Sequence, residues 1–591
     1  MPRYLDVLTG VPSTLAYGLR EKLKEGYGGG DFRADLMAGL VVGVVALPLS
    51  MALAIASGVA PQHGLYTAII AGVVCALLGG TRCQVTGPTA AFVVILVPIV
   101  VKFGLGGLLV AGLMAGVILI AMGALKLGNL IQYIPHPVTT GFTAGIAVVI
   151  GTIQLKDFFG LSFSAPESYV ERWRLMFHAR GTVSGWELGV GVVTLAMLLV
   201  IPRLQKRVPA PLIALVLASV GAAAAAHFIP GFHVATIGSR FSSLVSGHVV
   251  PGIPPLPPLP LNPFAMPGAG GAPMHFSFTL VQALLGPAFV IAMLGAIESL
   301  LAAVVSDGMS GTRHDPNAEL MALGIANVVC PLFGGIAATG ALARTATNIR
   351  AGARSPFAAV IHSVFVLLCT VALAPLVAYL PMAALAALLL TVARNMAEAR
   401  HFIHILRVAP RSDALVLLTC FSLTVVFDMV IAVSVGVVLA ALLFMRRMAE
   451  LSETKLDVGT MQRLDLPPGV KLYEIAGPLF FGAAQRAMSA FDNISGTKDA
   501  GQPQAVILFL GQVPAIDATG LVALETSIDK LKRSGNKVIL AGMRPQVAEV
   551  VARAGIAPER GHLAIAPDLD AALSLAMIHS LRVVPSANVP A

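Results

Sequence analysis

The chain has 591 residues, of which 57% are hydrophobic and only 12% are charged. Soluble domains carry about 25% charged residues, so this composition, with a mean hydropathy of +0.85, excludes a soluble protein with a large core. The formal net charge of +9 does not indicate nucleic-acid binding. From position 451 onward, 13 basic residues balance 13 acidic ones, so the whole excess belongs to the apolar part of the chain.

Apolar runs follow one another through the first 450 residues. A spanning helix needs roughly 20 apolar residues. The long runs are 34–56, 105–125, 136–153, 208–226, 281–305, 356–378 and 413–445, the last with room for two spans. Shorter runs lie at 65–78, 87–101, 186–201, 317–333, 340–350 and 381–393. By length we expect about fourteen transmembrane segments.

Basic residues cluster between these runs. The clusters are Arg20, Lys22 and Lys24; Arg203, Lys206 and Arg207; Arg350 and Arg354; Arg394, Arg400, Arg407 and Arg411; and Arg446-Arg447. With fourteen spans and a cytoplasmic N-terminus, every cluster lies on the cytoplasmic side, as the positive-inside bias requires. We therefore expect both termini in the cytoplasm and the protein in the inner membrane. The first thirty residues have no apolar h-region, so no cleavable signal peptide is expected.

The chain is expected to divide into several regions. Residues 1–30 form a cytoplasmic segment, and residues 31–448 form the transmembrane domain, with one repeat at about 31–228 and another at about 279–448. Between the repeats, residues 229–278 are a Pro/Gly-rich extracytoplasmic connector that includes PGIPPLPPLPLNP. Such proline density excludes helix interiors. A rigid linker is the favoured interpretation, and a peptide ligand is the alternative. Residues 154–185 are expected to be a polar extracytoplasmic loop.

Residues 455–585 are expected to form a separate cytoplasmic domain, and residues 470–585 within it have ordinary globular composition. Strand patterns at 504–510 and 536–541 alternate with helix patterns at 519–533 and 545–554. This alternation predicts a soluble α/β domain with a parallel or mixed sheet.

An eleven-residue phrase occurs twice. Residues 70–80 read IAGVVCALLGG and residues 325–335 read IANVVCPLFGG. Each copy is soon followed by a Thr-Gly pair, Thr86-Gly87 or Thr339-Gly340, and then by a short interrupted apolar segment. Paired, interrupted segments in corresponding positions of two halves indicate the binding site of a secondary transporter.

The two interrupted segments are expected to be half-helices. The first should begin near Pro88, a favoured first-turn residue, with Thr86 as its cap. If the halves are inverted, the half-helices meet N-terminus to N-terminus near the bilayer centre. Their free N–H groups and positive dipole ends would then form an anion site. The alternative is that Gly and Thr serve only close helix packing.

Two charged residues fall inside apolar segments. Arg344 enters the second half-helix, where it must face a cavity, a partner or an anion. We favour anion attraction over a snorkelling or structurally paired arginine. Glu298 lies within PAFVIAMLGAIESLLAAVVSDGM, where desolvation favours the protonated carboxylic acid, so it can carry a coupled proton. A structural hydrogen bond to a neighbouring helix is the alternative.

The five cysteines all lie in or beside apolar segments without metal-like spacing. They are expected to be small buried hydrophobic residues. We therefore expect no metal site and no cofactor.

Several motifs resemble the sulfate permease (SulP/SLC26) anion transporters. They are LVVGVVALPLSMALAIASGVAPQHGLYTA, TGPTAAF, HDPNAELMALGIANVV and ALARTATNIRAGARSPFAA, and VPAIDATGLVALE in the tail is similar to the family's STAS domain. The resemblance implies a multi-pass α-helical fold of seven-plus-seven inverted repeats with core and gate domains. It also implies elevator-like motion and a homodimer.

The resemblance further places the substrate between the third and tenth helices, beside the first and eighth. The implied substrate-binding residues are Leu49, Ser50, Thr86, Gly87, Pro88, Thr89, Gly340, Ala341, Ala343, Arg344 and Thr345.

The chain departs from the family pattern at several of these positions. In the bicarbonate branch the eighth helix carries an aspartate with a hydroxyl residue four positions on, whereas this chain has Glu298 and Ala302. Leu342 replaces the hydroxyl residue two positions before Arg344. A sodium site is therefore not expected, and proton coupling is favoured. Pro48-Leu49 stands where the family commonly has Pro-Gln, and Ala343 where a serine is frequent, so the pocket is less polar.

These observations predict a proton-coupled secondary transporter of small dianions. Residues 422–450 and the stretch GPLFFGAA at 477–484 look most like the C4-dicarboxylic acid transporters of this family, so succinate, fumarate or aspartate is the expected substrate. A sulfate or bicarbonate permease is the alternative within the family. Alternatives of other classes are an anion channel and a membrane-anchored signalling protein acting through the STAS domain.

In related bacterial regulators, the STAS domain carries a phosphorylatable serine directly after a loop aspartate. Here Asp517 is followed by Ala518, so that phosphorylation site is absent. We interpret the STAS domain as an assembly and regulatory module, and a cytoplasmic partner would bind the protein there.

Overall fold

The computed structural model describes residues 15–131, 135–163, 169–204, 209–245, 248–273, 277–427, 429–451, 453–456, 466, 469–479 and 505–583. The predicted GPLFFGAA stretch therefore lies outside the described residues from position 480 onward. The chain forms two compact units that divide after Val437.

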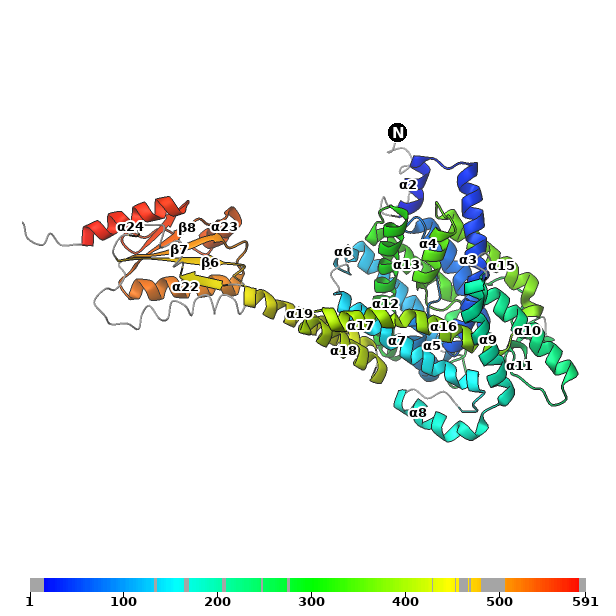
Figure 1. Ribbon diagram of the computed structural model, residues 1–591. Coiled ribbons are helices and arrows are strands. Elements are labelled where there is room, and N and C mark those ends of the chain that lie inside the picture. The colour runs from blue at the N-terminus through cyan, green and yellow to red at the C-terminus, as the bar shows by residue number, and fades with distance from the viewer. Residues whose placement is uncertain are drawn as a thin grey trace, which may run out of the picture. The chain divides into compact units, whose positions relative to one another are not determined.

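The first unit is a helical bundle (Figure 1). Its first half contains α3 (Gly29–Ala56), α4 (Pro61–Leu78), α5 (Ala90–Ala124), α7 (His136–Phe159), α9 (Gly185–Leu204) and α10 (Ala210–Phe228). Its second half contains α12 (Phe278–Ser310), α13 (Pro316–Val329), α14 (Leu342–Arg350), α15 (Phe357–Val377), α16 (Met382–Ala397), α18 (Arg411–Val426) and the start of α19 (Met429–Leu451). Five shorter helices of the described chain lie before or between them: α2 (Tyr17–Glu25), α6 (Gly128–Ile131), α8 (Tyr169–His178), α11 (Ile237–Arg240) and α17 (Ala399–Val408).

Ten helices among the described residues are long and apolar enough to cross a membrane. Helix α5 is two segments in one, because Gly104 adopts φ 69° and interrupts it. With α5 divided there and with the shorter α14, α18 and α19 added, each half has seven segments. The predicted fold class, a multi-pass helical protein of inverted repeats with a separate α/β domain, is confirmed.

The repeat symmetry is visible in the packing. Helix α3 packs on α15, and its counterpart α12 packs on α5; likewise α5 packs on α13, and α15 packs on α4. Helices α3, α4, α5 and α12 to α15 form one group, called the core group below. Helices α7, α9, α10, α16 and α18 form the other, called the gate group. Each half therefore contributes to both groups.

Glycines permit the closest helix crossing in the core group. A Cβ atom on Gly324 of α13 would lie 2.6 Å from the backbone nitrogen of Ile120 in α5. A Cβ atom on Gly116 would lie 2.7 Å from the Gly324 carbonyl oxygen. Small residues let helix backbones approach in this way inside a membrane. The five cysteines are buried and unpaired, as expected.

The two predicted loops contain regular structure. Helix α8 occupies part of the 154–185 stretch, where the amphipathic sequence YVERWRLMFH buries Arg172 and Met176. The connector holds α11 and an antiparallel hairpin of β2 (Ser242–Val245) and β3 (His248–Pro251). Its described proline run contains no α-helix, because proline lacks the N–H that a helix interior needs.

The second unit is an α/β domain with sheet order β5-β6-β7-β8-β9. Strands β6 (Val470–Ala476), β7 (Ala505–Gln512), β8 (Lys537–Ala541) and β9 (Leu563–Ala566) are parallel, and β5 (Glu453–Leu456) is antiparallel to β6. Helices α22 (Ala518–Arg533) and α24 (Leu569–Val583) lie on opposite faces of the sheet (Figure 1). Helix α23 (Pro545–Arg553) packs into the same apolar cluster as α22.

Candidate functional site

The two Thr-Gly pairs meet in the core group. Strand β1 (Thr86–Gly87) pairs antiparallel with β4 (Thr339–Gly340), so that Thr86 is opposite Gly340 and Gly87 is opposite Thr339. The Ala341 N–H donates to the Val85 carbonyl oxygen at 2.9 Å and extends the pairing. Equivalent segments of the two halves therefore run in opposite directions at one point, as inverted repeats require.

A half-helix starts directly after each strand. The first segment of α5 begins at Ala90 after Thr89, and α14 begins at Leu342 after Ala341. Neither start has a side-chain cap, which leaves first-turn N–H groups for a ligand. The prediction that Thr86 caps the first half-helix is wrong. The backbone stays extended through Thr89, at φ −123°, because residues 86 and 87 are held in the strand pair.

Arg344 lies in the first turn of α14 and is 3% exposed. Its Nη2 donates to the carbonyl oxygen of Pro88, so it joins the start of one half-helix to the start of the other. Its Nη1 has no partner within the described protein. Gly87 is what admits the guanidinium, since a Cβ atom there would lie 2.7 Å from Nη1. The arrangement leaves the two N–H donors of Nη1 for a ligand.

Glu298 lies in α12 and is 8% exposed. Its carboxylate accepts one described hydrogen bond, from the hydroxyl of Thr89 at 2.9 Å. Glu319, a second buried acid of the core group, differs sharply. Its carboxylate accepts from the Gly80 N–H and from the side chains of Thr81, Gln84 and Ser299, at 2.8–3.1 Å. Glu319 is therefore a fully bonded structural group, whereas Glu298 remains available for chemistry.

A cavity of about 130 Å³ lies at the junction of the half-helices. It is lined by Leu49, Leu53, Pro88, Thr89, Ala90, Ala91, Glu298, Gly340, Ala341, Leu342, Ala343, Arg344, Val392 and Met396. Arg344 and Glu298 are its two charged side chains. Helix α3 and α16 of the gate group contribute apolar walls. This agrees with the low polarity that the sequence predicts for the pocket.

Most of the predicted substrate-binding residues line this cavity, and four lie behind it. Thr86 and Gly87 are in the strand pair. The Thr345 hydroxyl accepts from the Val85 N–H at 3.1 Å and so has a structural bond. Ser50 is buried on α3, where its carbonyl oxygen leaves no room for a side chain at Gly64. These four residues position the cavity wall.

The sequence interpretation missed the Glu319 network. Glu319 lies in HDPNAELMALGIANVV, an apolar segment, so the signal that singled out Glu298 was present there too. It also missed Asn327. The Asn327 amide donates to the Leu323 and Ala338 carbonyl oxygens and accepts from the Ala338 N–H, each at 2.9 Å, and so fixes the approach to β4.

Comparison with known proteins agrees with this architecture. A model of the sulfate permease family matches residues 32–420, and a model of the STAS domain matches residues 463–572. YvdB of Bacillus subtilis (strain 168), provisionally named a sulfate transporter, is 40% identical over 90% of this chain and 95% of its own length. The bicarbonate transporter BicA of Picosynechococcus sp. is 29% identical over 83% of this chain and 85% of BicA.

Solved structures show the same fold. The structure of SLC26A9 superposes with a TM-score of 0.82 at 18% identity and covers 98% of this chain and 95% of that chain. The transmembrane domain of a cyanobacterial BicA superposes with a TM-score of 0.58 at 27% identity, over 70% of this chain and 98% of that domain. The chain therefore belongs to the sulfate permease family, whose members are anion transporters and not enzymes, and it carries a STAS domain.

Proposed function

We propose that this protein is a proton-coupled secondary transporter of small dianions, with C4-dicarboxylates such as succinate, fumarate or aspartate as its substrates. The observation that carries the proposal is the cavity where two uncapped half-helix starts, Arg344 and Glu298 converge. Dipole ends and a guanidinium attract an anion. Leu49, Leu53 and Met396 offer the apolar contact that a carbon skeleton uses and that sulfate does not.

Glu298 is the proposed proton carrier. It faces the same cavity as Arg344, so its negative charge repels a bound dianion. Protonation removes that charge and the repulsion with it. Substrate and proton then enter together. The core group carries both past the gate group in an elevator-like motion, in a homodimer with cytoplasmic termini in the inner membrane. Sulfate or bicarbonate is the alternative cargo, which the names of YvdB and BicA favour.

The test is uptake by proteoliposomes. We expect succinate to accumulate against its gradient when the outer solution is acidic, without sodium, and to compete with sulfate. Glu298→Gln should bind and exchange substrate but lose proton-driven accumulation. Glu319→Gln is the matched control: it loses acceptor bonds and stability but keeps the accumulation ratio, because Glu319 lies outside the cavity lining. Normal accumulation by Glu298→Gln would overturn the proton assignment, and a purely passive flux would identify a channel.

A further inference from the structure

A second, larger cavity lies at the far end of α3 and of the first segment of α5. Its volume is about 410 Å³, and none of its lining residues lines the central cavity. The α5 segment connects the two cavities. It starts at Ala90 beside the central cavity, and Val97, Val100 and Val101 reach the larger one. At 1.5 Å per residue, the outermost lining residues on this segment, Ala90 and Val101, lie about 16 Å apart, whereas on α3 Leu53 of the central cavity and Ile55 of the larger one are two residues apart.

The walls of this cavity differ in charge. The core-group wall is apolar and consists of Ile55, Ala56, Gly58, Val97, Val100 and Val101. The opposite wall, from α7, α8 and α11, carries the cations Lys156, Arg172 and Arg240. Asp157 is the acid in the described lining, and it accepts from Arg240 at 2.5 Å. Glu187 lies in the adjoining cavity, where it accepts from the Ala235 N–H at 2.5 Å. The larger cavity thus holds an excess of positive charge.

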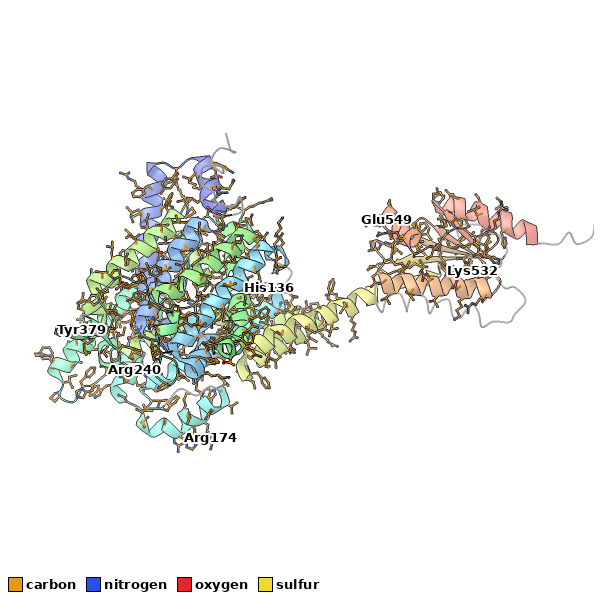
Figure 2. All side chains as sticks on the ribbon, turned by 180° about the vertical axis from the view of Figure 1, so that it is seen from behind. His136, Arg174, Arg240, Tyr379, Lys532 and Glu549 are labelled. Carbon is orange, nitrogen blue, oxygen red and sulfur yellow. The ribbon has the colours of Figure 1, made fainter. Side chains whose placement is uncertain are left out.

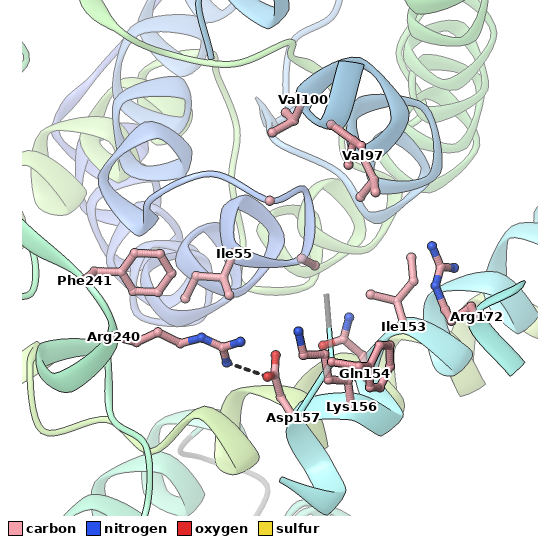
Figure 3. A pocket seen from close by; sticks show the side chains of 14 residues that line it. Ile55, Val97, Val100, Ile153, Gln154, Lys156, Asp157, Arg172, Arg240 and Phe241 are labelled. Atoms are coloured by element: carbon pink, nitrogen blue, oxygen red, sulfur yellow. Dashed lines mark hydrogen bonds and ion pairs between the residues drawn. The ribbon is translucent and has the colours of Figure 1, made fainter. Parts of the chain in front are cut away.

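A buried donor also points to a ligand here. Gln154 is 4% exposed and lines the cavity, and its Nε2 has no hydrogen-bond partner within the described protein. A buried amide without a partner costs free energy unless a ligand or water satisfies it. Figure 3 shows the ends of Gln154 and Lys156 pointing to the same side, next to the pair of Arg240 and Asp157. A neutral donor beside an ammonium group suits an oxyanion.

We propose that this cavity is a second anion site, where Lys156 and Gln154 hold a small oxyanion dianion before it reaches the central cavity. The proposal rests on the proposed function for the identity of the anion. Arg174 and Arg240 lie at the end of the first unit opposite α2 (Figure 2). In the proposed topology that end is extracytoplasmic, so the site collects anions from outside. Its cations belong to the gate group and its neighbours, so it stays in place while the core group moves.

Thiol labelling tests the site without requiring transport. The native cysteines are buried, so a cysteine introduced by Val101→Cys, at a position 41% exposed in the lining, can be labelled selectively. Val249→Cys, at a position 70% exposed outside the lining, is the reference. Relative to that reference, we expect an anionic methanethiosulfonate reagent to outpace a cationic one by about tenfold at Val101→Cys. Millimolar sulfate or succinate should slow this reaction.

The charge variants make the test specific. Lys156→Gln should lower the anionic preference about threefold or more, whereas Lys126→Gln, which removes an exposed lysine just beyond the other end of α5, should not change it. Equal reagent rates, a preference that survives Lys156→Gln, or no protection by either anion would overturn the proposal. Val100→Cys offers a second labelling position in the lining if Val101→Cys does not fold.

Two further arms separate the alternatives. If phosphatidylglycerol protects the thiol and soluble anions do not, a lipid headgroup occupies the cavity and the proposal is overturned. In transport, Lys156→Gln should raise the KM for outside dianion several-fold at unchanged maximal rate. If wild-type protein moves no dianion but the thiol is still protected, the proposed function fails and the second site stands. If wild-type protein transports and protection is absent, only the second site fails.

Discussion

Replacing Gly87 with alanine should weaken dianion binding while leaving the fold intact. The new Cβ atom would lie 2.7 Å from Nη1 of Arg344, the nitrogen without a protein partner, and 3.2 Å from Nη2. Ordinary contact needs about 3.4 Å, so the guanidinium has to retreat by about 0.7 Å. A charge-assisted hydrogen bond is worth about 1.5–3 kcal/mol. Its loss would raise the dissociation constant of the dianion about 10- to 100-fold.

The backbone gives no reason for this variant to unfold, because Gly87 is not among the described glycines with positive φ. The assay is initial-rate uptake of radiolabelled dianion by proteoliposomes, with thermal unfolding measured on the same preparations. Gly295→Ala is the matched control, since a Cβ atom there meets its nearest neighbour, the Phe92 ring, at an ordinary 3.5 Å. A wild-type KM in Gly87→Ala would refute the role of Arg344 as a substrate ligand held by this contact.

Three further changes test the supporting structure. Asn327→Leu leaves both backbone groups of Ala338 buried and unpaired, and should cost about 3 kcal/mol, seen as a lower thermal midpoint in detergent. Gly324→Ala forces α13 away from the backbone of α5 and should cost about 1–3 kcal/mol, whereas Gly112→Ala, with its nearest contact at 3.5 Å, should be tolerated. Asp517→Ala removes the carboxylate that caps α22 at 2.7 Å. It should cost about 1 kcal/mol, measured as roughly fivefold faster amide exchange in the first turn of that helix.

The sequence predicted the meeting of the two Thr-Gly pairs because two independent signals coincide there: a repeated phrase and a paired interruption. Arg344 was found by the same logic, since a charge in an apolar segment needs a partner or a cavity. The start of the first half-helix was not predictable from local propensity. Thr86 has a good capping side chain, but its backbone pairs with a strand in the other half of the chain, and local sequence does not reveal that pairing.

The roles of Glu298 and Glu319 show a second limit. Both are acids in apolar segments, Glu298 in the middle of one and Glu319 near the start of another. What separates them is the number of donors that other segments supply, including a Gln84 amide 235 residues away in sequence. Only the packed repeats decide which acid is fully bonded and which faces the cavity.

In the second unit, β7, β8, α22 and α23 were predicted, whereas β6, β9 and α24 were not assigned.

The pairing of β1 with β4 also sets an order of events during synthesis. Arg344 and Pro88, which join the half-helices, are 256 residues apart in sequence. At 5–20 residues per second, the ribosome needs roughly 10 to 50 seconds to add that length of chain. During this interval the nascent first repeat holds an unpaired strand and an uncapped helix start within the bilayer. A chain that stalls before the second repeat therefore exposes unsatisfied backbone groups, each of which is costly inside the bilayer.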